Sequence, residues 1–174
     1  MPVDHPSTPQ SSARPDPGVV VDRAYELISF AAGGAPGWDA FRQLFVQQAV
    51  LALRVFPGDA AVTVMDMNAY VVAQMGHGLG EAGYTEIPGA RQVHITGDIA
   101  VIYQDFAMQF ATGDPVPALD VFSLCRIDGQ WRIVSIVSDM RPTDAEVSPR
   151  KSALRAEAVE DRLARPQSPA GSAP

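Results

Sequence analysis

Cysteine and basic residues are both scarce in this sequence, and each shortage excludes a class of protein. Cys125 is the single cysteine among 174 residues, so no intrachain disulfide can form and the fold depends on an apolar core. Lys and Arg number 13 against 20 Asp and Glu, which gives a net charge of -7. Nucleic acids and anionic membrane surfaces bind basic faces, so we expect neither as a partner. Solubility is a sufficient explanation for the acidity.

Targeting and membrane segments are also missing. Residues 1–17 contain neither the basic region nor the apolar stretch of a secretory signal. No apolar run reaches the ~18 residues that a membrane-spanning helix needs. We therefore expect a soluble, cytoplasmic protein.

Motifs for metal ions and cofactors are absent as well. The sequence has three histidines, without HxH or HExxH spacing. His77 is followed four positions later by Glu81, but both lie in the glycine-rich segment "GHGLGEAG". The glycines of that segment do not match a phosphate-binding loop. We expect neither a metal ion nor a cofactor.

The composition divides the chain into three parts. Residues 1–17, rich in Pro and Ser, are expected to be a disordered tail. Residues 18–141 hold most of the apolar side chains and predict one domain. Residues 142–174 form a C-terminal tail, in which Ser148-Pro149 predicts a helix over 149–164.

Two long hairpins dominate the second half of the domain. The first covers residues 83–111 and is closed by Gly97-Asp98. The second covers residues 118–140 and is closed by Asp128-Gly129. A two-residue turn of Gly and Asp between β-branched and aromatic runs is a strong hairpin signal.

The first half of the domain is mainly helical by the spacing of its apolar residues. Helices are expected after Asp16-Pro17, over 38–45 and after Asp66, with one strand over 49–55. Helices followed by hairpins predict an α+β fold, in which three N-terminal helices pack on a strongly curved antiparallel sheet.

Three segments carry a resemblance to a known superfamily. They are "DAFRQLFVQQAVLALRV", "GLGEAGYTEIPGARQVHITGDIAVIYQDFAMQF" and "DPVPALDVFSLCRIDGQWRIVSIVSDM". Together they resemble the NTF2-like (SnoaL-like, DUF4440-like) superfamily, in a subgroup without assigned activity. The resemblance implies a cone-shaped fold with a pocket at its open end and a homodimer formed through the outer face of the sheet. Members include isomerases, dehydratases, cyclases, epoxide hydrolases and non-catalytic modules, so fold does not settle function.

Strand alternation sorts polar residues by face and gives two candidate sites. In the second hairpin, Asp120 and Asp139 are expected on one face, where two carboxylates can act as acid and base. The alternative is that both are solvated at the rim of the cone. In the first hairpin, His94, Tyr103 and Asp105 share a face and are candidates for proton transfer. Their alternative is a polar outer sheet face, exposed or covered in a dimer.

Resemblance adds further candidates. Steroid isomerases and dehydratases of the fold use a tyrosine of the first helix as a hydrogen-bond donor, which implies that role for Tyr25, although a packed core tyrosine is the alternative. Gln47 and Gln48 stand where those enzymes tend to carry an acid, and because glutamine cannot act as a general base, this departure argues against proton-transfer catalysis. Asp105 resembles an aspartate of the epoxide hydrolases, which works there with an arginine and a second aspartate. Tyr103 and Ile136 stand where those two partners are expected, which argues against that chemistry. Glu86 is similar to a recurrent family glutamate. Aromatic residues expected to line the pocket are Trp38, Tyr70 and Phe122.

Three hypotheses about function follow. The first is a protein that binds a small apolar molecule in its cavity, favoured by the apolar strand faces. The second is a cofactor-free isomerase, dehydratase or cyclase that uses pocket acids with His94 or Tyr25. The third is a non-catalytic, dimeric interaction module.

Overall fold

The computed structural model describes residues 15–76 and 78–142. The four helices of this part are α1 (Gly18–Ile28), α2 (Trp38–Arg42), α3 (Met67–Gln74) and α4 (Leu79–Ala82). Its six strands are β1 (Phe45–Leu53), β2 (Thr63–Met65), β3 (Tyr84–Thr96), β4 (Ile99–Phe110), β5 (Val116–Ile127) and β6 (Gln130–Met140). Most of the N-terminal tail and the helix predicted over 149–164 lie outside the described residues.

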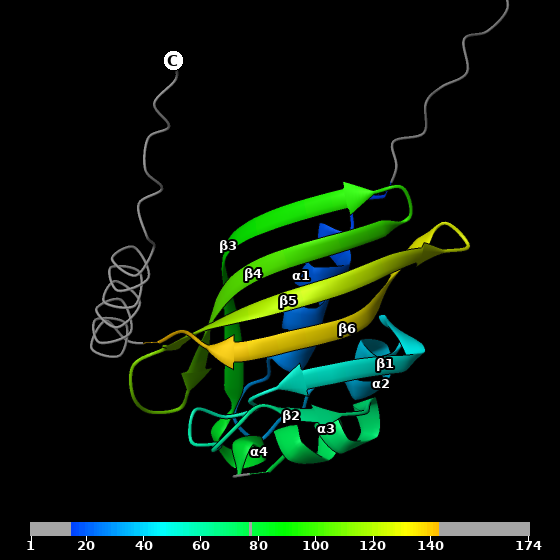
Figure 1. Cartoon of the computed structure of the whole chain (residues 1–174). Coiled ribbons are helices and arrows are strands. Elements are labelled where there is room, and N and C mark those ends of the chain that lie inside the picture. Colours follow the sequence, from blue (N-terminus) through cyan, green and yellow to red (C-terminus); the bar gives the residue numbers. More distant parts are fainter. Residues whose placement is uncertain (1–14, 77, 143–174) are drawn as a thin grey trace, which may run out of the picture. The chain divides into compact units, whose positions relative to one another are not determined.

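One curved sheet contains all six strands, in the order β2-β1-β6-β5-β4-β3. The helices lie on one face of it, and β3 and β4 bend along their length (Figure 1). The α+β prediction is confirmed, but the fully antiparallel sheet is wrong at one pairing, because β1 runs parallel to β6. Parallel neighbours need a long connection, and here the rest of the domain lies between the two strands.

The boundaries in the first half differ from the prediction by a few residues. Helix α2 ends at Arg42 and β1 already begins at Phe45, because Phe45 is buried and pairs with Ile133 of β6. The short helix α4 and the edge strand β2 were not predicted. The predicted cap of α3 is confirmed, since Asp66 Oδ1 accepts a hydrogen bond of 2.8 Å from the Ala69 amide.

A bulge in β3 changes which of its side chains face inward. Near the turn, Gln92 lies opposite Tyr103, which is the register that a two-residue turn at Gly97-Asp98 implies. The register then shifts between residues 88 and 91, where β3 holds one extra residue. Beyond one extra residue, the side chains that would have pointed to one face of the sheet point to the other. Glu86 therefore faces inward, whereas an unbroken register would place it on the outer face with His94.

The side chain of Gln104 holds this bulge together. Gln104 is fully buried, and its Nε2 donates to the carbonyl oxygens of Gly89, Ala90 and Asp105 at 3.0, 3.3 and 2.8 Å. Its Oε1 accepts from the guanidinium of Arg91, which also donates to an aspartate of α1. The amide thus satisfies backbone groups that the disrupted ladder leaves unpaired.

A second bulge, between Ser123 and Leu124, shifts the other hairpin in the same way. Arg126 lies opposite Trp131, as the two-residue turn at Asp128-Gly129 implies. Beyond the bulge that register would place Phe122 opposite Ser135, but Phe122 pairs with Ile136 and Asp120 with Ser138. Asp139 pairs with Leu119. The prediction that Asp120 and Asp139 share a face is therefore wrong, since the extra residue in β6 turns Asp139 outward and Ser138 inward.

The core lies between the helices and the inner face of the sheet. Its fully buried side chains come from both layers and include Val21, Ile28, Leu51, Ile102, Phe122 and Ile133. None of the helices in the described part of the chain is long and apolar enough to cross a membrane.

Candidate functional site

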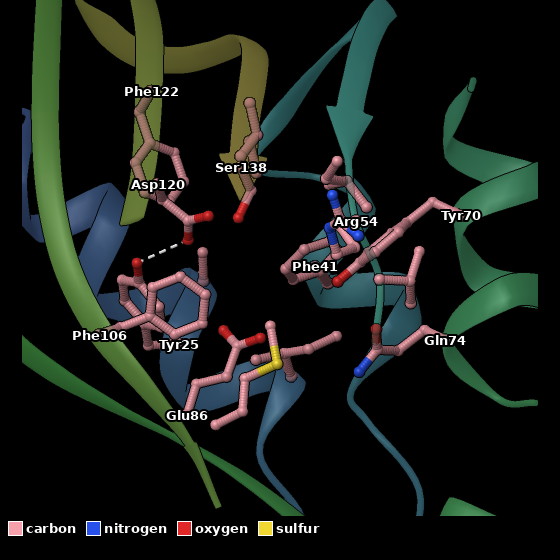
Figure 2. Close-up of a pocket in the computed structure, with 16 residues that line it drawn as sticks. Tyr25, Phe41, Arg54, Tyr70, Gln74, Glu86, Phe106, Asp120, Phe122 and Ser138 are labelled. Atoms are coloured by element: carbon pink, nitrogen blue, oxygen red, sulfur yellow. Dashed lines mark hydrogen bonds between the residues drawn. The ribbon is translucent and has the colours of Figure 1, made fainter. Parts of the chain in front are cut away.

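A cavity opens between the helices and the inner face of the sheet (Figure 2). The volume that the centre of a water molecule can occupy is about 40 Å³. The total empty volume, which includes the solvent-filled mouth of the cavity, is about 450 Å³. The lining is mostly apolar, with Phe41, Phe106, Met108, Phe122 and Ile136 among the side chains. The polar side chains that line it are those of Tyr25, Arg54, Tyr70, Gln74, Glu86, Asp120 and Ser138.

Asp120 on β5 is a buried carboxyl with two hydroxyl neighbours. The phenol of Tyr25 donates to Asp120 Oδ2 at 2.7 Å, and Ser138 faces it from β6 (Figure 2). The pKa of Asp120 is raised from 3.8 to about 6 by burial, against the hydroxyls of Ser138 and Tyr25, which favour the ionised form. Asp120 therefore titrates close to neutral pH.

Glu86 on β3 is the second carboxyl of the cavity. The residue as a whole is partly exposed, but its carboxyl points inward (Figure 2). Tyr84 donates to Glu86 Oε1 at 2.8 Å, and the Glu86 amide donates to the hydroxyl of Ser29 at 3.0 Å. The pKa of Glu86 is raised from 4.5 to about 8, first by burial and then by the negative charge of Asp120, against the hydrogen bond from Tyr84.

These two carboxyls form one electrostatic unit. Because each resists ionisation while the other is charged, the pair loses its protons in two separate steps. The hydroxyls of Tyr25 and Ser138 favour the charge on Asp120, and the negative charge of Asp120 favours the proton on Glu86. Two acids whose pKa values are pushed apart can serve as base and acid at the same pH.

Three tyrosines surround the pair as neutral donors. Burial raises the pKa of Tyr25, Tyr70 and Tyr84 above the ordinary value of 10, and the nearby carboxylates raise it further. The ring of Tyr25 packs against Phe106 and Phe122, with ring centroids 5.6 and 6.1 Å apart. These phenols therefore stay protonated over the pH range in which the two carboxyls titrate.

The cation of the lining is already engaged. Arg54 Nε is 2.8 Å from Asp139 Oδ1, and Arg54 also donates to the carbonyl oxygen of Asp59 at 2.6 Å. The side chain of Gln74 on α3 is not fully engaged in this way. Gln74 is only 2% exposed, and its Nε2 has no hydrogen-bond partner.

The cavity brings together part of the predicted site. Tyr25, Tyr70, Asp120 and Phe122 all line it. Trp38 packs behind it, with its ring 6.0 Å from that of Tyr70.

The remaining predicted residues are not in the lining. His94, Tyr103 and Asp105 lie on the outer face of the sheet, with the rings of His94 and Tyr103 6.2 Å apart. Asp139 is outside as well, in its ion pair with Arg54. The structure thus separates these four residues from Tyr25.

Sequence reasoning missed three inward polar residues. The sequence pattern gives no role to Glu86 and no sign that Gln74 or Ser138 faces a cavity. Both Glu86 and Ser138 face inward only because of the bulges. Pro88-Gly89 in the middle of a strand pattern is the available signal for the bulge in β3, whereas residues 130–140 of β6 contain neither Pro nor Gly. Gln74 lies on a helix face whose apolar spacing gives no sign of a buried amide.

A metal site is not found in the part of the chain that the structure describes. No group of three His, Cys, Asp or Glu side chains in residues 15–76 and 78–142 is placed to hold an ion. His77, considered above as a ligand, lies outside the described residues.

Comparison with known proteins places the fold. No protein-family model and no curated protein matches the chain. Among solved structures, an NTF2-like protein with a cystatin-like fold from Novosphingobium aromaticivorans aligns with a TM-score of 0.56 at 17% identity, over 75% of this chain and 83% of that one. A candidate dehydratase of the NTF2-like family from Streptomyces avermitilis gives 0.54 at 13% identity, over 72% and 94%. A candidate ketosteroid isomerase from Shewanella frigidimarina gives 0.53 at 21% identity, over 71% and 94%. The chain therefore has the NTF2-like fold.

Proposed function

We propose that the protein is a cofactor-free acid–base catalyst that moves a proton within a small, mostly apolar molecule bound in the cavity. The observation that carries the proposal is the convergence of Asp120 and Glu86 in one apolar cavity. Isomerisation and dehydration are the reaction classes that such a pair serves, and neighbours of the same fold bear names of both kinds.

In this mechanism Asp120 is the base and Glu86 the acid. Asp120 Oδ takes a proton from a carbon next to a carbonyl group, and the electron pair of that C–H bond moves toward the carbonyl oxygen. Glu86 gives its proton to that oxygen, which leaves a neutral enol. Asp120 then returns its proton to another carbon while the enol O–H proton goes back to Glu86, which completes an isomerisation. In a dehydration, the electron pair of the C–H bond forms a C=C bond as the C–O bond breaks, and the proton of Glu86 goes to the departing hydroxyl, which leaves as water. Exchange with solvent then moves the proton from Asp120 back to Glu86. The Tyr25 hydroxyl keeps Asp120 oriented throughout.

Hydrogen–deuterium exchange tests the proposal without a known substrate. The α-protons of cyclohexanone and 2-cyclohexen-1-one are followed by NMR in D₂O with and without protein. We expect exchange above the buffer rate, rising near pH 6 and falling near pH 8, because Asp120 must be ionised and Glu86 protonated. Asp120→Asn and Glu86→Gln should each abolish the enhancement.

Asp105→Asn is the matched control, because Asp105 lies in the same sheet with its side chain on the outer face. It should retain the exchange rate of the unmodified protein. Exchange at the buffer rate for both ketones, or equal loss in Asp105→Asn, would overturn the proposal.

Non-catalytic binding is the second candidate function. It is favoured by the mostly apolar lining of the cavity, which suits a hydrocarbon ligand whether or not that ligand reacts. Saturable binding of the same ketones without exchange would support this candidate over catalysis.

We also propose that two copies associate through the outer face of the sheet. Tyr103, Val121 and Val137 lie side by side across β4, β5 and β6, and Val137 is 51% exposed. A continuous apolar row on a sheet face is typical of a surface that another protein covers. Such a dimer is compatible with either function of the cavity and also with a pure interaction module.

A further inference from the structure

Gln74 is a buried donor without a partner at the wall of the cavity. Its side chain reaches in from α3, on the side opposite Asp120 (Figure 2). Its Nε2 is the single buried side-chain nitrogen or oxygen in the described part of the chain that lacks a hydrogen bond. Buried polar groups are nearly always paired, so an orphaned donor in a cavity points to an acceptor supplied by a bound molecule.

The surrounding charges restrict the kind of acceptor. Asp120 and Glu86 share the cavity with Gln74, and a bound anion would be repelled by the carboxylate. Arg54, the cation in the lining, is held by Asp139 and by the Asp59 carbonyl oxygen, which leaves no uncommitted positive charge among the described lining residues. A neutral oxygen meets the donor without this penalty.

An amine is disfavoured at the same position. The Nε2 group only donates hydrogen bonds, so an ammonium group in the cavity would pair with a carboxylate and leave Nε2 without an acceptor. The rest of the lining is aromatic and aliphatic, which suits a hydrocarbon body.

We propose that Gln74 is the recognition residue for a neutral carbonyl oxygen, and that the cavity takes small ketones or enones whose apolar body packs against the phenylalanines. The inference rests on the proposed function only in the claim that the same molecule reacts at Asp120. Gln74 does not transfer a proton, and its amide fixes the orientation of the carbonyl group.

A pair of probes isolates the amide from the rest of the cavity. 2-Cyclohexen-1-one and cyclohexene have the same ring and differ in the carbonyl oxygen. Binding of each is measured by NMR titration to the full chain, to Gln74→Met and to Asn68→Met. Asn68 is an exposed amide on the same helix and serves as the matched control.

Gln74→Met should weaken binding of the enone about tenfold and leave binding of cyclohexene unchanged, because only the hydrogen bond is lost. Asn68→Met should change neither. In the unmodified protein the enone should shift the side-chain amide signals of Gln74, a readout that does not depend on how the variant folds.

Three results would overturn the inference. They are equal weakening of both probes in Gln74→Met, unchanged binding of both, and amide signals of Gln74 that do not respond to the enone. Absence of α-proton exchange together with an intact preference for the enone would instead refute the proposed catalysis and leave the recognition role of Gln74 standing.

Discussion

Replacing Glu86 by glutamine is expected to stabilise the protein at high pH. Glutamine keeps an oxygen that accepts from Tyr84 and removes the ionisable group. Because folding raises the pKa of Glu86 from 4.5 to about 8, the folded state holds its proton more tightly than the unfolded state does. The stability from this group is complete below pH 4.5 and is lost as pH rises through about 8.

The pKa difference sets the size of this effect. A pKa change from 4.5 to about 8 in the folded state corresponds to about 5 kcal/mol between the two protonation states. Part of it comes from the charge of Asp120, so we expect Glu86→Gln to gain about 3–5 kcal/mol over the unmodified protein at pH 9 and almost nothing at pH 4. Total stabilities of single domains are typically about 5–15 kcal/mol, so the gain is large enough to measure.

Urea denaturation between pH 4 and pH 9 measures the free energy of unfolding, with the fluorescence of Trp38 and Trp131 as the signal. Glu81→Gln is the control, because Glu81 is exposed and its replacement should leave the pH profile unchanged. Parallel profiles for the unmodified protein and Glu86→Gln would show that the carboxyl of Glu86 is solvated, which would refute the reasoning.

Three further predictions concern the neighbouring interactions. Tyr25→Phe should raise the pKa of Asp120, because the lost 2.7 Å hydrogen bond favours the carboxylate; carboxyl NMR checks this, and an unchanged or lower pKa would contradict it. Gln104→Leu should lower the free energy of unfolding by about 2–4 kcal/mol in urea denaturation, because buried carbonyl groups of the bulge lose their hydrogen-bond donor. A decrease below about 1 kcal/mol would mean that other contacts hold the bulge. Val137→Asp should convert the proposed dimer to a monomer in analytical ultracentrifugation, because it places a charge in the apolar row of the outer sheet face. Val72→Asp, at an exposed position of α3, should leave the dimer intact. An unmodified protein that is already monomeric would refute the proposed assembly.

The sequence predicted most of the fold because its strongest signals are local. The Gly97-Asp98 and Asp128-Gly129 turns and the β-branched runs beside them define both hairpins and their register near the turns. The helices follow from apolar spacing and from the cap at Asp66. The parallel pairing of β1 with β6 joins segments far apart in the chain, and no local pattern encodes it.

The candidate site was only half predictable, and the reason lies in the two bulges. Extrapolating each hairpin from its turn is correct for Asp120 on β5, but it fails beyond the extra residue in β3 and in β6. Glu86 and Ser138 were therefore missed, and Asp139 was assigned to the wrong face. A bulge depends on tertiary partners such as the buried Gln104 amide, which period-two alternation does not reveal.

Carbon-detected NMR titration of the carboxyl groups of Asp120 and Glu86 tests the central claim most directly, namely that the two acids share one buried cavity. We expect both to titrate well above the ordinary values of 3.8 and 4.5, and the pKa of Glu86 to fall in Asp120→Asn, because the neighbouring negative charge is gone. Two carboxyls that titrate near pH 4, independently of each other, would contradict the shared site and with it the proposed chemistry.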